Sequence, residues 1–391
     1  MIKIQNKKDC CGCSACVQKC PKTCIRMKPD EEGFLYPSID QTVCVDCGLC
    51  ENVCPVINKR EERVPVITLA VKNINEEIRL KSSSGGVFSA LAIKVLKDGG
   101  LVFGAKFNEK WEVVHDCIEE IDDLHLFQGS KYVQSAIGET FSQAKSFLRK
   151  GKIVLFSGTP CQIAGLKNFL GEEYLNLLTV EVVCHGTPSP MIWSDYLHYL
   201  IVNQKIKGAR SLSDISSISF RSKVTGWKNF SFEIRTAMGN SFRETFNTNI
   251  FMKGFLNNLY LRPSCYCCPA RKGRSGADIS LADFWGVSNL HKGIDDDKGI
   301  GLVFANSSSG IDYLESIAPT LSSIESVYDV AVKYNPCIVT NVEEPLSRED
   351  FFNDYKEKKI YAIKSVCKDM EPSILKRCIN VIKAILRTVV L

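Results

Sequence analysis

The most constraining feature of this sequence is a cysteine pattern that occurs twice near the N-terminus. Each copy reads C-x2-C-x2-C-x3-C and is followed directly by proline. The chain has 19 cysteines in 391 residues, and ten of them lie within the first 54 residues. Disulfide frameworks are typical of small secreted chains, whereas thiolate ligation of metals is typical of reducing compartments. Because the first residues lack the apolar core of a signal peptide, we expect a cytoplasmic protein whose thiols are metal ligands.

The two copies have the ligand spacing of 4Fe-4S clusters and resemble the two-cluster bacterial ferredoxins. Three closely spaced cysteines surround one corner of an iron–sulfur cube, and the fourth, before proline, ligates the other cluster. Zinc sites usually pair two C-x2-C knuckles, which makes zinc the weaker alternative. Cys11 and Cys24 are then spare thiols, which we expect to be small buried hydrophobes. The expected ligands are Cys10, Cys13, Cys16 and Cys54 for cluster 1, and Cys44, Cys47, Cys50 and Cys20 for cluster 2.

Composition and charge place the rest of the chain among ordinary globular proteins. Hydrophobic residues make up 45% and charged residues 24%. The formal charge of +5 is too small to indicate a nucleic-acid partner, and no stretch has the roughly 20 apolar residues of a membrane-spanning helix. We expect a ferredoxin-like domain over residues 1–57, a charged linker over 58–64, a larger domain over 65–345 and a C-terminal helical tail over 346–391.

From Val66 onward, strand and helix patterns alternate, which predicts an α/β (α+β) fold with a mixed sheet that is at least partly parallel. An antiparallel hairpin is predicted over Ser216–Thr236, and a basic amphipathic helix over Ser373–Leu391. Such a helix could lie on an anionic membrane surface, but packing on the domain or on a partner is the favoured alternative. The expected strands are 66–71, 101–107, 152–156, 177–184, 215–221, 230–236 and 301–305, and the expected helices are 86–97, 138–149, 162–170 and 191–203.

Four further cysteines lie at predicted strand ends or in a knuckle. Cys161 follows the apolar run Ile153–Phe156, and Cys184 ends the strand-like run that begins at Leu177. Cys265 and Cys268 form a C-x2-C knuckle. Four thiols are the number that one further cluster needs. The alternative is a set of buried cysteines in which the knuckle is a lone zinc half-site.

A serine- and glycine-rich segment, Ser82–Val87, opens a predicted helix. Free N–H groups and the helix dipole favour phosphate at such a position. N-capping serines followed by a turn would give the same pattern. The segment is neither a Walker A loop nor G-x-G-x-x-G, so by itself it indicates only an anion site.

Six motifs occur in a fixed order after the cysteine module. They are Ser-Ser-Gly-Gly-Val at 83–87, Gly-Ser-Lys-Tyr-Val-Gln-Ser at 129–135, Gly-Thr-Pro-Cys-Gln at 158–162, Cys-His-Gly-Thr-Pro-Ser at 184–189, Arg-Pro-Ser-Cys-Tyr-x-Cys at 262–268 and Ala-Asp-Ile-Ser-Leu-Ala-Asp-Phe-Trp-Gly at 277–286. Together they resemble the coenzyme F-420 hydrogenase/dehydrogenase beta-subunit family, over roughly residues 5 to 345. Two departures are Ala282, where the family commonly has glycine, and the additional thiol of Cys267.

The resemblance implies a flavin (FAD) beside a third 4Fe-4S cluster in a large flavin-binding domain. Lys131, if it faces the flavin, would stabilise the anionic reduced ring, and His185 could donate a proton, although a lone histidine is more often structural. The implied cluster ligands are Cys161, Cys184, Cys265 and Cys268, and the implied flavin contacts are Ser84, Gly85, Gly86, Ser130, Lys131, Tyr132, Gln134, Ser135 and Asp283.

These expectations together describe an iron–sulfur flavoprotein oxidoreductase. Electrons would pass between a ferredoxin-type partner, the clusters and a small organic substrate at the flavin, which exchanges two electrons with the substrate but single electrons with clusters. The first alternative is a non-catalytic electron-transfer subunit of a larger redox complex, linked to polysaccharide biosynthesis as in similar bacterial proteins. The second is a structural metalloprotein without turnover.

Overall fold

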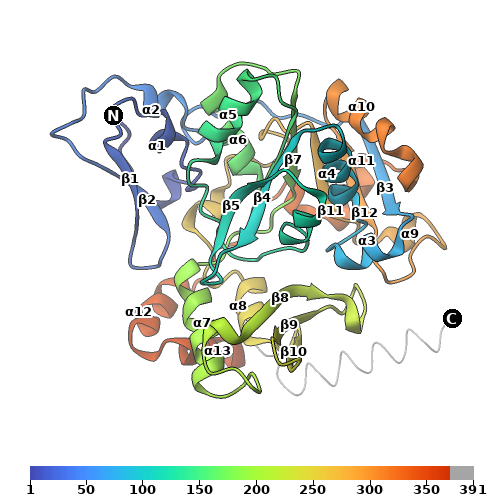
Figure 1. The fold of residues 1–391 in the computed structure, drawn as a ribbon. Helices are drawn as coiled ribbons and strands as arrows, with labels where there is room; N and C mark the ends of the chain where they lie inside the picture. Colours follow the sequence, from blue (N-terminus) through green and yellow to red (C-terminus); the bar gives the residue numbers. More distant parts are fainter. Residues whose placement is uncertain (370–391) are drawn as a thin grey trace.

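The computed structural model describes residues 1–369, and the helix predicted over Ser373–Leu391 lies outside them. An eight-stranded mixed sheet forms the centre of the molecule (Figure 1). Among the described residues, no helix is long and apolar enough to cross a membrane. In spatial order the strands are β13 (Leu321–Glu325), β3 (Ile67–Asn73), β12 (Gly301–Ala305), β11 (Ile279–Asp283), β7 (Leu177–Val182), β6 (Val154–Gly158), β4 (Leu101–Phe107) and β5 (Val113–Ile118).

The sheet is parallel in its middle and antiparallel at both sides. The pairs β4–β6, β6–β7 and β7–β11 are parallel. The pairs β11–β12, β12–β3, β3–β13 and β4–β5 are antiparallel. The prediction of a partly parallel sheet is therefore confirmed. Because parallel strands end at the same edge, the segments that follow β6, β7 and β11 emerge close together.

Helices cover both faces of this sheet, which explains why its central strands are almost continuously apolar. Successive side chains of a strand point to opposite faces, so Val102 and Phe103 of β4 enter different cores. One face packs against α4 (Val87–Lys97) and α10 (Ser308–Ser316), and the other against α5 (Thr140–Arg149) and α6 (Pro160–Leu170). Three shorter helices complete this part of the fold: α3 (Glu76–Lys81), α9 (Val287–Leu290) and α11 (Tyr328–Tyr334).

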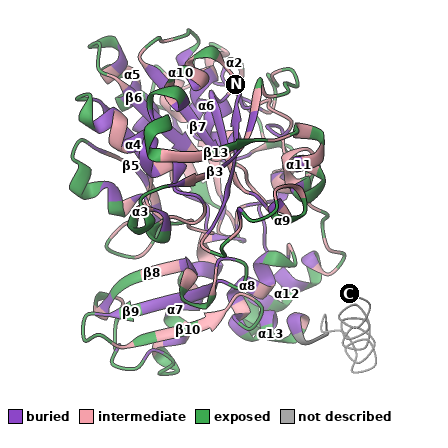
Figure 2. Cartoon of the chain, turned by 90° about the vertical axis from the view of Figure 1, so that its right-hand side faces the viewer, coloured by how far each residue is buried: buried purple, intermediate pink, exposed green. Residues whose placement is uncertain are grey.

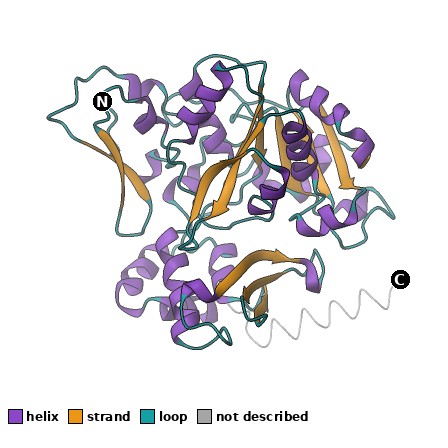
Figure 3. Ribbon diagram, in the orientation of Figure 1, coloured by secondary structure: helices purple, strands orange, loops and turns teal. Residues whose placement is uncertain are grey.

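The N-terminal cysteine module packs on α6 and is otherwise a small separate unit. Its elements are η1 (Lys7–Asp9), α1 (Ala15–Lys19), β1 (Ile25–Pro29), β2 (Leu35–Ile39) and α2 (Leu49–Asn52). Strands β1 and β2 pair antiparallel, and the module appears at one side of the large sheet in Figure 3. Cys11, Cys13 and Ala15 enter the same core as α5 and α6. The module therefore lies directly against the helical face of the sheet.

Apart from the two cores on the faces of the large sheet, a second packed unit lies below that sheet. Its core combines a three-stranded antiparallel sheet with helices (Figure 2). The strands β8 and β9 confirm the predicted hairpin. The segment expected as a C-terminal helical tail contributes α12 and α13 to this core. The elements are α7 (Pro190–Val202), β8 (Ile215–Ser222), β9 (Ser231–Thr236), β10 (Ser241–Thr245), α8 (Ile250–Leu256), α12 (Arg348–Lys358) and α13 (Ile360–Asp369).

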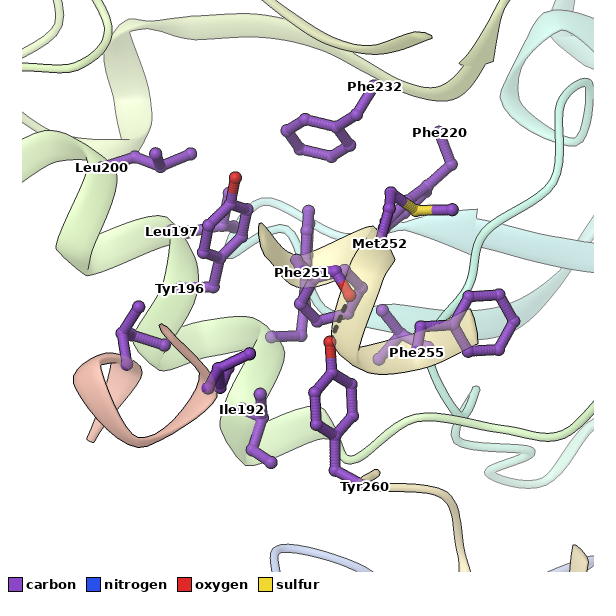
Figure 4. Close-up of a cluster of buried hydrophobic side chains, with 14 of the residues drawn as sticks. Ile192, Tyr196, Leu197, Leu200, Phe220, Phe232, Phe251, Met252, Phe255 and Tyr260 are labelled. Carbon is purple, nitrogen blue, oxygen red and sulfur yellow. Dashed lines mark hydrogen bonds between the residues drawn. The ribbon is translucent and has the colours of Figure 1, made fainter. Parts of the chain in front are cut away.

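Aromatic side chains fill the core of this second unit (Figure 4). Phe220 of β8, Phe232 of β9 and Phe251 of α8 converge on one another. The hydroxyl of Tyr260 donates a hydrogen bond to the carbonyl of Phe251, so this buried polar group is satisfied. Burying each such side chain contributes roughly 1.5–3 kcal/mol. This core gives a rigid support to the segments that lead into the site.

Candidate functional site

The first cysteine group of the N-terminal module lies inside the protein. Cys13, Cys16 and Cys54 are each less than 9% exposed. Burial, followed by negative charge at Cys10 and Cys54, raises the pKa of the Cys16 thiol to about 12. The four predicted ligands of cluster 1 are thus gathered in one place. Metal coordination deprotonates a thiol outright, so Cys16 would become a thiolate when it holds a metal.

The second cysteine group lies farther out. Cys20, Cys44, Cys47 and Cys50 line one small pocket together with Cys24. The sulfur atoms of Cys20 and Cys24 are 3.3 Å apart, and Cys47 is exposed. The structure therefore brings together the four predicted ligands of cluster 2 near the surface. Cys24, expected to be a buried spare thiol, is indeed buried, but it touches this group.

A third cysteine group forms where the large sheet ends. Cys161 begins α6 directly after β6, Cys184 follows β7, and Cys265 lies in η5 (Pro263–Cys267) with Cys268 after it. All four thiols line a common pocket. Burial raises the pKa of the Cys268 thiol to about 12, and negative charge at Cys161 contributes to the rise. Cys267 is exposed and does not line this pocket, so it stands apart from the group.

Among residues 1–369, no three His, Cys, Asp or Glu side chains converge as ligands of one metal ion. The thiolates around an iron–sulfur cube bind four different iron atoms, so they stand farther apart than the ligands of a single ion. Each group contains four predicted ligands, the number that one cube needs.

Cys11 connects the first group to the third, which the sequence did not indicate. Interaction with the Cys13 thiol raises the pKa of the Cys11 thiol, and interaction with the Cys161 thiol opposes this rise. Cys11 is 6% exposed and also lines the pocket of the third group. Cys11 is not part of the repeated cysteine pattern, so no local pattern predicts its contact with Cys161. Only the tertiary structure identifies this contact.

A second cavity, of about 290 Å³, opens on the other side of the segment that follows β7. Thr159, Cys184, Gly186 and Thr187 line both this cavity and the pocket of the third cysteine group. The two sites therefore share a wall. Of the residues predicted to contact a flavin or to act in catalysis, those that line the cavity are Ser84, Gly85, Gly86, Ser130, Lys131, Tyr132, Ser135, His185 and Asp283.

Gln134 is the exception among the predicted flavin contacts. It does not line the cavity. Its amide instead bonds to the guanidinium of Arg262 at 3.0 Å and to the carbonyl of Cys11 at 3.4 Å. The Gln134 side chain is therefore directed toward the N-terminal module, whereas Ser135 lines the cavity.

Lys131 is the principal unpaired cation of the cavity. Its ammonium donates to the carbonyls of Gln128 and Gly129, at 3.2 and 3.3 Å, and lies 5.9 Å from the centre of the Phe107 ring. It forms no ion pair with a carboxylate of the described residues. Burial lowers the pKa of Lys131 to about 7. An anion bound in the cavity would reverse this shift, because a nearby negative charge favours the charged ammonium.

Asp283 is held in place at the floor of the cavity by two side chains that the sequence analysis missed. Its carboxylate accepts hydrogen bonds from the guanidinium of Arg221 and, at 3.0 Å, from the indole of Trp227. Burial lowers the pKa of Arg221, but Asp283 and Tyr132 together raise it above its usual value. Phe284 is fully buried among apolar neighbours rather than in the cavity wall. The separation of 62 residues between Arg221 and Asp283 explains why no local pattern revealed this pair.

Two histidines line the cavity. The Nε2 atom of His185 lies 2.6 Å from Oδ1 of Asn258, and burial lowers the His185 pKa. A neutral His185 that donates from Nε2 leaves Nδ1 as an acceptor. His115, which the sequence analysis missed, is fully buried, its Nε2 lies 3.0 Å from the carbonyl of Ser157, and burial lowers its pKa to about 4. Both imidazoles are therefore neutral near pH 7.

The serine- and glycine-rich segment forms the opposite wall of the cavity. A Cβ atom on Gly85 would lie 2.2 Å from the carbonyl oxygen of Val71 and 2.6 Å from the amide nitrogen of Gly301. Only glycine therefore allows this segment to lie flat on β3 and β12. Gly86 has φ +84° and precedes the first turn of α4. The free N–H groups of that turn adjoin the cavity, as an anion site requires.

Two family models match parts of this chain. Residues 151–323 match the family model for the C terminus of the beta subunit of coenzyme F420 hydrogenase/dehydrogenase. Residues 9–58 match the 4Fe-4S dicluster domain. The two matched segments contain the three cysteine groups described above.

Individual relatives agree with this division. The chain is 26% identical over 201 residues to the coenzyme F420-dependent sulfite reductase of Methanocaldococcus jannaschii, over 51% of this chain and 31% of that protein. It is 24% identical over 162 residues to the F subunit of the F(420)H(2) dehydrogenase of Methanosarcina mazei, over 39% of this chain and 46% of that protein. The matched segments span less than half the length of these curated relatives.

Two further comparisons concern the N-terminal module and the fold. The module is 49% identical over 43 residues to the 7Fe ferredoxin of Hydrogenibacillus schlegelii, over 11% of this chain and 49% of that ferredoxin. A chain in a structure of the F420-reducing NiFe hydrogenase complex from Methanosarcina barkeri aligns with 79% of this chain and 93% of its own length, at 17% identity and a TM-score of 0.44. At this TM-score the likeness supports no functional assignment.

Proposed function

Since the chain carries a 4Fe-4S dicluster domain and a C-terminal domain of the coenzyme F420 hydrogenase/dehydrogenase beta subunits, we propose that it is an iron–sulfur flavoprotein oxidoreductase. It passes electrons between ferredoxin-type clusters and an organic substrate at a bound FAD. The observation that carries this proposal is the wall shared by the third cysteine group and the second cavity. When bound, the clusters supply one-electron steps and the flavin exchanges two electrons with its substrate.

The third cysteine group fits a 4Fe-4S cluster in number and chemistry. Its four thiols are Cys161 at the start of α6, Cys184 just after β7, Cys265 within η5 and Cys268 just after η5. The amide of Thr187 donates to the sulfur of Cys265 at 3.4 Å, as hydrogen bonds to cluster ligands do. Arg262 and Arg271 also line this pocket and offset the charge of four thiolates.

The second cavity fits the flavin. Its volume of about 290 Å³ lies at the lower end of the range of small-molecule sites, roughly 300–1,000 Å³. The N-terminal turn of α4 with Ser84, Gly85 and Gly86 would hold the phosphates. Lys131, which lacks a carboxylate partner, would balance negative charge on the ring or on a phosphate. These features are independent of the cysteines and support a large anionic ligand.

The remaining polar residues would control protons and orientation. Asp283, fixed by Arg221 and Trp227, offers a carboxylate that accepts hydrogen bonds from the ligand. His185 carries its proton on Nε2 toward Asn258, so Nδ1 is available to accept a proton. We therefore assign His185 the role of acceptor rather than the donor role expected from the sequence.

Anaerobic purification of the full chain tests this proposal. The protein should contain about 12 iron atoms, an equal amount of acid-labile sulfide and about one FAD. About eight iron atoms without flavin would contradict the enzyme assignment. The substrate class is then found by adding candidate donors, namely reduced ferredoxin, reduced deazaflavin and NADH, and by following the flavin absorbance.

A second function, electron transfer within a larger complex, is favoured by one observation. The matched segments cover less than half the length of the two curated relatives described above. The name of one relative says that it is a subunit of a dehydrogenase. Cys47 of the outer group is exposed, and Val43 and Val45 beside it are also exposed, so another protein could approach this group. If the isolated chain holds all its cofactors but oxidises no small donor until a co-purifying protein is added, this second function is the correct one.

A further inference from the structure

One side chain, Arg262, joins the first cysteine group to the third. Its Nε donates to the carbonyl of Cys10 at 2.7 Å, and its Nη2 lies 3.4 Å from the sulfur of Cys10. The backbone carbonyl of the same residue accepts a hydrogen bond from the amide of Cys265 at 2.8 Å. A single residue thus contacts a predicted ligand of cluster 1 through its side chain and a predicted ligand of the third cluster through its backbone.

The charge of Arg262 has no carboxylate partner among the described residues. It is 1% exposed, and its other hydrogen bonds go to the carbonyl of Leu35 and the amide oxygen of Gln134. Three other buried arginines of the described residues pair with acids, Arg79 with Asp296, Arg221 with Asp283 and Arg348 with Glu32. The fourth, Arg271, has no carboxylate partner among these residues and lines the pocket of the third cysteine group. A buried cation normally requires an anion. The anion available to Arg262 is the thiolate of Cys10 when that residue holds iron, because its sulfur lies 3.4 Å from Nη2.

The N-terminal module is shaped to admit this guanidinium. Gly12, between Cys11 and Cys13, has φ +72°. A Cβ atom there would lie 2.4 Å from Nε2 of Gln134 and 2.9 Å from Nη1 of Arg262. The ring of Tyr36 covers the guanidinium at 4.3 Å. The loop of cluster 1 therefore packs around Arg262 with no room for another side chain.

We propose that Arg262 is a positioning residue that holds Cys10 against the third cysteine group and stabilises the reduced state of the cluster held by Cys10. The inference rests on the proposed function, because it takes Cys10 and Cys265 as cluster ligands. Reduction adds one electron, supplied by the ferredoxin-type donor, and hence one negative charge, with no bond broken and no proton taken up. The guanidinium offsets that charge at close range in a dry environment, where charges and hydrogen bonds to sulfur set cluster potentials.

The test is an EPR-monitored redox titration of the anaerobic full chain and its variants. The signal of cluster 1 is identified by its loss in Cys16→Ser. In Arg262→Gln, cluster 1 should become at least tenfold harder to reduce, which for one electron is about 59 mV toward negative potential. Arg262→Lys keeps the charge but loses the bonds to Cys10 and should shift the midpoint by less than tenfold in the same direction.

Arg348→Gln is the matched control. Arg348 is also buried and also ties the N-terminal module to the body of the protein, through Glu32, but it touches no cysteine. Its removal should change the reduction equilibrium of cluster 1 by less than twofold. An equal shift in the two glutamine variants would overturn the inference, since module docking would then set the potential.

The remaining outcomes are also decisive. An iron-replete Arg262→Gln protein that titrates like the wild type overturns the inference. If that variant loses its iron, an unshifted midpoint in Arg262→Lys overturns it instead. Failure of the proposed function is read separately, from the iron and flavin content of the wild type. A wild type with about eight iron atoms and no flavin would refute that function, yet the Arg262 comparison at cluster 1 could still be made.

Discussion

The N-terminal cysteine module and the third cysteine group contain the same kind of ligand but are built in opposite ways. In the module, eight predicted ligands lie between Cys10 and Cys54. Short spacing within one loop brings together three ligands of each cluster, and the other copy of the pattern supplies the fourth. In the third group, four cysteines between Cys161 and Cys268 come from the ends of β6 and β7 and from η5. Local spacing thus specifies the first kind of site, whereas the second exists only after the parallel sheet has formed. A substitution that removes the cluster of one site should therefore leave the clusters of the other site in place.

The largest expected effect separates the two kinds of site directly. Cys184→Ser removes one thiolate from the third group, and a cube that loses a ligand at a buried site should be lost with its four irons. The iron content should fall from about 12 to about 8 atoms per chain. The EPR signals of the two N-terminal clusters should remain.

Cys16→Ser is the matched variant on the other side of the comparison. It should also remove about four irons, while the flavin stays bound because the cavity is built by the large sheet. If either variant lost all its iron, the two sites would be one cooperative unit and the comparison would be wrong.

The next effect concerns the cavity wall. In Gly85→Ala the new Cβ would collide with backbone atoms of Val71 and Gly301, which cannot move aside as a flexible side chain can. The wall segment must shift, at a cost of roughly 1–3 kcal/mol. We expect at least a tenfold weaker retention of FAD in equilibrium dialysis, with unchanged iron. Lys97→Ala, at an exposed position of α4 that does not line the cavity, is the control, and equal losses in both variants would contradict the role of close packing.

A smaller effect is expected from Lys131→Gln, which keeps the size of the side chain but removes the charge. Flavin affinity should fall about tenfold near pH 6, as for the loss of one close charge interaction. Burial lowers the Lys131 pKa to about 7 in the free protein, so wild-type affinity should decline as the pH rises above that value. The variant should show no such decline in a fluorescence titration from pH 6 to 9. A parallel decline in both proteins would assign the titration to another group.

The smallest effect is on the stability of the flavin-free protein. The Lys131 pKa is lower in the folded chain than the value of about 10.4 in unfolded chains. The unfolded state therefore binds more protons between pH 7 and about 10, so this residue makes wild-type stability rise with pH in that window. Lys131→Met should raise the melting temperature at pH 7 by more than at pH 10. A larger gain at pH 10 would contradict the lowered pKa.

The sequence was sufficient where the determining contacts are local. The apolar runs predicted β4 and β12 with the bounds found in the structure, Leu101–Phe107 and Gly301–Ala305. They succeeded because both faces of these strands are buried, which leaves an unbroken apolar pattern. The edge strands β5 and β13 escaped prediction, since their partly exposed residues interrupt that pattern.

The same distinction between local and long-range contacts applies to the residues of the candidate site. Its motifs could be found because each is a short turn at a strand end or helix start. The long-range contacts of Arg221, Arg262 and Cys11 could not be found, because the partners lie 62 to 252 residues away in the chain. Gln134 lies in the motif at 129–135. Its side chain points away from the cavity, whereas neighbouring residues of the motif line the cavity. Which face a residue of an irregular segment occupies is decided by packing against other elements.

One measurement tests the central claim most directly, namely that thiol-held clusters and a flavin exchange electrons across the wall formed by residues 183–187. It is an anaerobic reductive titration of the purified full chain, with reduced ferredoxin as donor and absorbance as readout. The chain should take up about five electrons, three in clusters and two in the flavin, and the flavin band should bleach. Uptake of about two electrons with no change in a flavin band would contradict the account.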